Sequence, residues 1–207
     1  AEQGFALRTA QGTVMRGWAL TFQGHGEEGI ALLRQGLAAF RATGAEFHRP
    51  VYLAMLAEAY KKVGQTQEGL STIAAALDAV NNTGDRFYEA ELHRLKGELT
   101  LQQSHVSGST FQVANRRVGM APHDITVAEV RTAGGAHPAG EEEAEACFRK
   151  AIEVAQKQSA RLWELRASMS LARLWQSQGK KVEARQMLAE IYNWFTEGFD
   201  TKDLQEA

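Results

Sequence analysis

The chain has 207 residues, of which 44% are apolar and 23% charged, and this balance supports a packed core and excludes disorder over most of its length. Its 23 basic and 25 acidic residues give a net charge of −2, so no overall positive field would collect nucleic acid or anionic lipid. No apolar run approaches the roughly 20 residues needed to span a bilayer, and no secretory signal opens the chain. We therefore expect no nucleic-acid partner, no membrane partner and a cytoplasmic location, which the single cysteine, Cys147, also suits.

Prolines and glycines divide the chain into expected helices. Only three prolines occur, and Pro122 and Pro138 lie in one stretch, so long segments without helix breakers remain on either side. In chain order we expect helices at residues 3–23, 26–42, 46–63, 66–81, 86–103, 140–158, 161–178 and 181–196. Residues 203–207 read as a helix still under way and the first residue is not Met, so we expect a fragment of a longer protein.

A shift of 40 residues aligns the chain with itself. The aligned pairs include Gly24 with Gly64, Gly29 with Gly69, Thr43 with Thr83, and Phe47 with Phe87. Within a unit, apolar residues recur every three or four positions on two helices that a glycine such as Gly64 separates, and small residues let the two backbones approach. We predict one domain of four helical hairpins, with repeats near residues 10–49, 50–89, 90–164 and 165–204.

The second repeat resembles the tetratricopeptide (TPR) pattern of small, aromatic and glycine positions. It carries this pattern at Leu53, Leu56, Ala57, Tyr60, Gly64, Gly69, Ile73, Ala76 and Leu77. The resemblance implies an all-α fold, a right-handed superhelix of about four hairpins. The period of 40 residues exceeds the usual 34 and the closing proline is missing, so we expect longer helices and an altered superhelix.

The third repeat contains an insertion at residues 104–138. Its first helix starts normally with Leu92 and Leu95, but the second appears only near Ala144. Several glycines and two prolines predict a non-helical segment. Three alternatives stay open, namely a flexible loop, a β-hairpin with strands at 111–115 and 125–130, and a hinge that swaps the second half of the repeat onto a neighbouring molecule.

The sequence signatures of catalysis are missing. The chain has no phosphate-binding glycine loop, no two-histidine zinc helix and no serine nucleophile elbow. His105, His123 and His137 all lie in the insertion, but their separations follow no ligand spacing, and simple solvent exposure explains them better. We expect Cys147 to be a small buried apolar residue, and we predict no enzymatic activity, no cofactor and no metal site.

The TPR resemblance also implies a partner-binding groove on the first helices of the hairpins, apolar at its N-terminal end and charged further along. The residues carried over to it are Met15, Trp18, Phe22, Met55, Glu58, Lys62, Arg94, Glu98, Arg166 and Arg173. Trp18 and Phe22 lie one helical turn apart, as an apolar anchor requires, although they could equally pack against a preceding repeat. The asparagine of the chaperone-binding carboxylate clamp is absent, so we do not expect that mode of binding.

Residues 191–207, which begin Ile191-Tyr192-Asn193-Trp194-Phe195, resemble the end of large bacterial signalling proteins. Those proteins carry a class III adenylate or guanylate cyclase or another output domain, a predicted ATPase and a C-terminal TPR region. The resemblance covers nearly the whole chain except residues 104–138, and it transfers neither enzymatic activity. We expect Trp194 and its aromatic neighbours to be buried and to seal the open end of the last repeat.

These observations predict a noncatalytic module that regulates a cytosolic signalling enzyme. Its partner would be a protein or peptide segment, or upstream domains of the same polypeptide. The alternative is a sensor that binds a short peptide or small effector in a pocket around Trp18, Phe22 and Met55. The sequence leaves the oligomeric state and the identity of the partner open.

Overall fold

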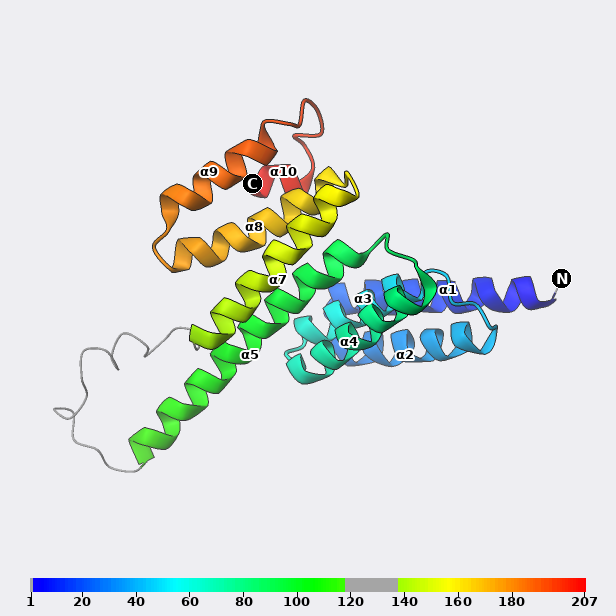
Figure 1. The fold of residues 1–207 in the computed structure, drawn as a ribbon. Helices are drawn as coiled ribbons and strands as arrows, with labels where there is room; N and C mark the ends of the chain where they lie inside the picture. The colour runs from blue at the N-terminus through cyan, green and yellow to red at the C-terminus, as the bar shows by residue number, and fades with distance from the viewer. Residues whose placement is uncertain (1, 118–137) are drawn as a thin grey trace. The chain divides into compact units, whose positions relative to one another are not determined.

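The computed structural model describes residues 2–117 and 138–207, and these residues form helices and no strands (Figure 1). The helices are α1 (Glu2–Phe22), α2 (Gly26–Ala42), α3 (Arg49–Lys62), α4 (Thr66–Thr83), α5 (Glu89–Arg117), α7 (Pro138–Lys157), α8 (Arg161–Ser177), α9 (Lys181–Tyr192) and α10 (Lys202–Glu206). The all-α prediction is confirmed. None of the helices in these two ranges is long and apolar enough to cross a membrane.

The helices pair in the order that a hairpin repeat requires. The chain divides into two compact units, residues 1–95 and 96–207. In the first unit α1 packs against α2 and α3 against α4, and α3 also contacts both helices of the preceding hairpin. In the second unit α8 packs against both α7 and α9. The prediction that all four repeats form one continuous solenoid concerns the two units together, and it stays a prediction.

In the first hairpin, glycines bring the backbones of α1 and α2 into direct contact. A Cβ atom on Gly17 would lie 2.7 Å from the carbonyl oxygen of Gly29, and one on Gly36 would lie 2.7 Å from the side chain of Val14. Larger residues fill the grooves on either side, and Phe40 of α2 meets Tyr52 of α3 edge to face, with ring centroids 5.0 Å apart. The close approach expected from the small residues is therefore confirmed.

In the second unit, Gly97 of α5 provides the same kind of approach to α7. A Cβ atom at this position would lie 2.5 Å from Cε1 of Phe148, whose side chain is 1% exposed. Phe148 packs with Ala144, Leu171 and Leu174, and α5 and α9 add Leu101 and Met187 to this cluster. The glycine thus leaves room for the largest side chain in the core of this unit.

The prediction for the start of the insertion is wrong. Helix α5 does not end at residue 103 but continues to Arg117, so residues 104–117 are helical, and so is the first strand expected at 111–115. Extending an existing helix carries no nucleation cost. Gly108, the single glycine in this stretch, lowers the stability of the helix by only about 1 kcal/mol relative to alanine. Residues 118–137, with the second expected strand, His123 and His137, lie outside the described residues.

Most other expected helices agree with the structure within three residues at each end. Helix α2 spans residues 26–42, as expected, and Gly64 has φ +79° at the end of α3, where the sequence predicts a helix terminus. The largest remaining difference is α9, which ends at Tyr192 rather than residue 196. The chain then turns and forms α10 at Lys202–Glu206, close to the expected helical start at 203.

The substitution Gly97→Ala tests the contact between α5 and α7. Because the new methyl group would overlap the ring of Phe148, we expect a loss of about 1 to 3 kcal/mol in unfolding free energy. The matched control is Gly12→Ala, because Gly12 is an exposed residue inside α1 with no atom within 4 Å of an added Cβ. Its substitution should stabilise the chain by about 0.5 to 1 kcal/mol. Urea unfolding followed by circular dichroism measures both, and two equal effects would contradict the assigned contact.

Candidate functional site

Six of the groove residues lie together in the first unit, on a surface that we call the α1–α3 face. It consists of Met15, Trp18 and Phe22 of α1 and Met55, Glu58 and Lys62 of α3. Trp18 Nε1 donates a hydrogen bond of 3.0 Å to Glu58 Oε2, and Lys62 Nζ lies 4.6 Å from the centroid of the Phe22 ring. The rings of Trp18 and Phe22 are 4.7 Å apart. The structure therefore brings Trp18, Phe22, Glu58 and Lys62 into contact across two successive repeats.

The α1–α3 face combines anchored and accessible apolar groups. Trp18 and Met55 are half-buried against the core of the first unit. Met15 and Phe22 are each 44% exposed, so a large part of both side chains is open to contact. Lys62 is exposed beside Phe22, and Glu58 is half-buried beside Trp18. A partner would thus meet apolar area flanked by one charge of each sign.

Arg94 does not face outward as the sequence predicts. It is 6% exposed, and its Nε and Nη2 atoms donate hydrogen bonds of 2.8 and 2.6 Å to the two carboxylate oxygens of Glu91. Such a two-point pair holds a buried arginine by satisfying its charge. Its position favours a structural role over the predicted contact with a partner.

The other three groove residues belong to the second unit. Glu98 of α5 accepts a hydrogen bond of 3.1 Å from the hydroxyl of Ser170. The guanidinium of Arg166 lies over the ring of Trp163, and its Nε atom is 3.6 Å from Oδ1 of Asp203. Arg173 is exposed, and its Nη2 atom donates a hydrogen bond of 3.0 Å to Oε2 of Glu206. Arg166 and Arg173 of α8 therefore both contact carboxylates of α10. That the ten residues bind a partner stays a prediction.

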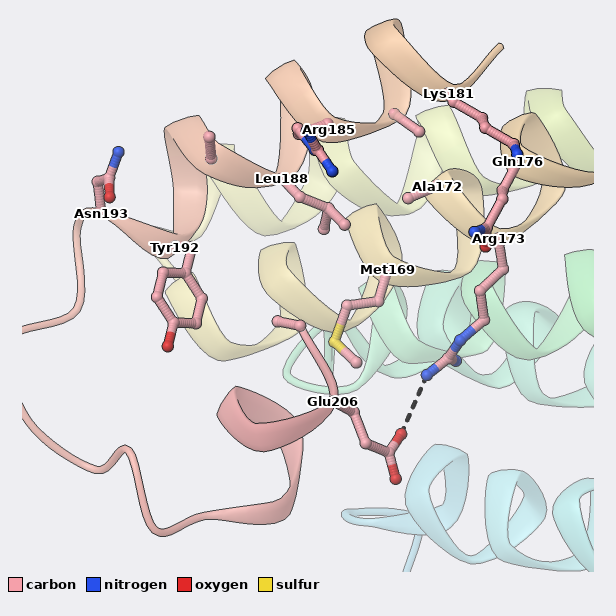
Figure 2. A pocket seen from close by; sticks show the side chains of 13 residues that line it. Met169, Ala172, Arg173, Gln176, Lys181, Arg185, Leu188, Tyr192, Asn193 and Glu206 are labelled. Atoms are coloured by element: carbon pink, nitrogen blue, oxygen red, sulfur yellow. Dashed lines mark hydrogen bonds and ion pairs between the residues drawn. The ribbon is translucent and has the colours of Figure 1, made fainter. Parts of the chain in front are cut away.

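A cavity of about 560 Å³, which we call the terminal groove, lies between α8, α9 and α10 (Figure 2). The residues that line it are Met169, Ala172, Arg173 and Gln176 of α8, Lys181, Ala184, Arg185, Leu188, Ala189 and Tyr192 of α9, Asn193, Glu206 and Ala207. Its floor is apolar, since Met169, Ala172 and Ala184 are at most 6% exposed. Its rim is basic, with Arg173, Lys181 and Arg185 all exposed.

Helix α10 closes one end of the last hairpin through a single buried side chain. Leu204 is 5% exposed and packs with Leu165, Met169 and Ile191, and Phe195 and Tyr192 pack against this cluster. The prediction that Trp194 is buried is wrong, because its side chain is 57% exposed and lies under the guanidinium of Arg161. Helix α9 ends before Trp194, which leaves this ring outside the packed stripe.

A second cavity, of about 550 Å³, is lined by residues of α7, α8 and α9 together with Trp194. All of its charged side chains except Glu190 are already paired. Arg149 contacts Glu145, and Arg161 contacts Glu164. Lys157 and Lys150 hold the pKa of Glu153 at about 2. This cavity therefore offers a ligand less unpaired charge than the terminal groove.

The described residues contain no group of three or more histidine, cysteine or acidic side chains that could hold a metal ion. Cys147 is 7% exposed, which confirms the expectation of a buried side chain, and burial raises the pKa of its thiol. Of the three insertion histidines, only His105 lies in the described part of the chain, where it is exposed on α5.

Sequence reasoning missed the basic side of the terminal groove. Lys181 and Arg185 lie on α9, the second helix of the α8–α9 hairpin, whereas the family pattern assigns binding to first helices. Their spacing of four residues places them on one face of α9, and this was the signal available in the sequence. The carboxylates of Asp203 and Glu206 on either side of Leu204 were the second signal.

No protein-family model matches the chain, and no curated protein matches it. Solved structures do match. One is the crystal structure of a variant of a putative kinesin light chain with nearly identical TPR-like repeats from Podosopora anserina, at 18% identity and a TM-score of 0.41 over 90% of this chain and 93% of that chain. Another structure of the same repeats has 18% identity and a TM-score of 0.40 over 90% of this chain and 94% of that chain. Both are structures of TPR-like repeats.

The substitution Leu204→Ala tests how the last hairpin is closed. Because Leu204 is buried among three apolar residues, we expect it to lower the unfolding free energy by about 2 to 3 kcal/mol. Trp194→Ala removes a larger but exposed side chain and should cost less than about 1 kcal/mol. Urea unfolding of the two variants gives both values. A larger loss for Trp194→Ala would mean that the tryptophan closes the hairpin after all.

Proposed function

We propose that this chain is a noncatalytic interaction module that binds a protein or peptide segment on the α1–α3 face. The observation that carries the proposal is the contact of apolar and charged side chains from two successive first helices. Met15 and Phe22 offer exposed apolar area, and Trp18 is held in place by its hydrogen bond to Glu58. Anchors of this kind, held in place before binding, supply most of the affinity of a peptide-binding surface.

The charged groups of the α1–α3 face favour a partner that carries both apolar and charged side chains. Lys62 lies beside the Phe22 ring, so an acidic group next to an apolar anchor of the partner would meet a cation there. Glu58 already accepts one hydrogen bond from Trp18, and its other oxygen can accept from a donor of the partner. We therefore propose a segment in which an apolar side chain is followed by a carboxylate.

The proposed role is regulatory. The sequence resembles the C-terminal TPR region of bacterial cytosolic signalling proteins with a cyclase or other output domain and an ATPase. On that basis the partner is another protein or an upstream domain of the same polypeptide. A partner that prefers one arrangement of the repeats shifts an attached output domain by its differential affinity for that arrangement.

The double substitution Met15→Ala/Phe22→Ala tests the proposal, because both side chains are exposed and their loss should leave the core intact. The immobilised chain is exposed to cytosolic extract, the retained proteins are identified by mass spectrometry, and the affinity of each is then measured with the purified protein. We expect the double substitution to weaken binding of the partner by at least about tenfold.

The control is Phe47→Ala/Phe87→Ala, which removes two exposed phenylalanines of the same unit, 65% and 64% exposed, outside the α1–α3 face. This variant should bind the partner as the unchanged chain does. Equal affinity of both double variants would contradict a role for the α1–α3 face.

A further inference from the structure

We infer that the terminal groove is a second docking surface, which receives an acidic amphipathic helix of a partner protein. This inference is independent of the α1–α3 face, because it rests on other residues in the other unit of the chain. It follows from the shape and apolar character of the floor, from the charge of the rim, and from the way α10 already binds beside the groove.

The floor of the groove has the composition of a helix-packing surface. Ala172 of α8 and Ala184 of α9 are small and nearly buried, and Met169 and Leu188 extend the apolar strip along the two helices (Figure 2). Small residues at a helix crossing let a third backbone approach, as glycines do between α1 and α2 in the first unit. A helix with an apolar stripe therefore fits this floor better than an extended chain does.

The rim of the groove selects for negative charge. Lys181 and Arg185 lie one turn apart on α9, and neither makes an ion pair with another residue that the structure describes. Across the groove, Arg173 of α8 shares its charge with Glu206, which is the single acidic side chain among the described residues that line the groove. Three basic side chains against one acidic side chain leave an excess of positive charge around an apolar floor.

Helix α10 is an example of the ligand that this surface takes. Leu204 enters the apolar cluster, while Asp203 lies 3.6 Å from Arg166 and Glu206 lies 3.0 Å from Arg173. This pattern of acid, leucine and acid lies within residues 202–206, and Glu206 is one of the residues that line the groove (Figure 2). A longer helix with the same pattern would place its carboxylates near Lys181 and Arg185.

The probe is a fluorescein-labelled synthetic helix of about five turns, with leucine and alanine on one face and glutamate on the other. A scrambled peptide of the same composition, which has no continuous apolar face, is the control ligand. Fluorescence anisotropy with the full chain should show saturable binding of the amphipathic peptide, at least about tenfold tighter than that of the scrambled peptide.

Two pairs of variants locate the site. Lys181→Glu/Arg185→Glu should weaken binding by at least about tenfold, whereas Arg34→Glu/Arg41→Glu, with the same change in net charge on exposed residues of α2, should change it less than about twofold. Glu206→Gln frees Arg173 and should tighten binding, whereas Glu197→Gln, at an exposed residue outside the groove, should not. Circular dichroism confirms that each variant is folded.

The inference is overturned if the amphipathic peptide does not bind, or if both charge-reversal variants lose affinity equally. Equal affinity for the scrambled peptide or for a single-stranded DNA oligonucleotide would also overturn it, because charge alone would then explain the binding. The variant Met15→Ala/Phe22→Ala should bind the peptide with unchanged affinity. The result at the terminal groove therefore does not depend on whether the α1–α3 face binds a partner.

Discussion

The close approach of helix backbones is the constraint on which the rest of this structure depends. Gly17, Gly29 and Gly36 bring α1 against α2, and Gly97 leaves space for the Phe148 ring between α5 and α7. Helices that approach this closely expose their remaining apolar stripes toward the next hairpin. Within each unit, a hairpin therefore depends on its neighbours for burial, and the buried residues form separate clusters in the two units.

The terminal groove lies where α10 packs against the α8–α9 hairpin. Here the fourth hairpin is covered in part by α10, through Leu204 and two carboxylates that meet Arg166 and Arg173. The apolar floor and basic rim of the terminal groove come from the way α8 and α9 pack, and they give the proposed second docking surface its specificity.

The sequence predicts the hairpins well because their signals are local and repeated. Helix α2 agrees with its expected bounds, since glycines and turn residues lie at both ends. The predictions for the end of α5 and for the burial of Trp194 failed because each rested on a single feature. Gly108 does not stop α5, and the aromatic character of Trp194 does not bury it once α9 has ended. For the site, the family pattern assigned Trp18, Phe22, Glu58 and Lys62 to first helices, and their role in binding stays a prediction. The pattern could not show that Glu91 would neutralise Arg94 or that second helices contribute Lys181 and Arg185.

Hydrogen–deuterium exchange of the full chain, with and without saturating acidic amphipathic peptide, tests most directly whether the terminal groove is a docking surface. Helix α9 suits this measurement because only Ala184 and Ile191 of its side chains are buried, so its amides should exchange readily in the free chain. The account predicts that the peptide slows exchange in α9 several-fold and leaves α1 to α4 unchanged. Slower exchange in α1 and α3, with none in α9, would contradict it.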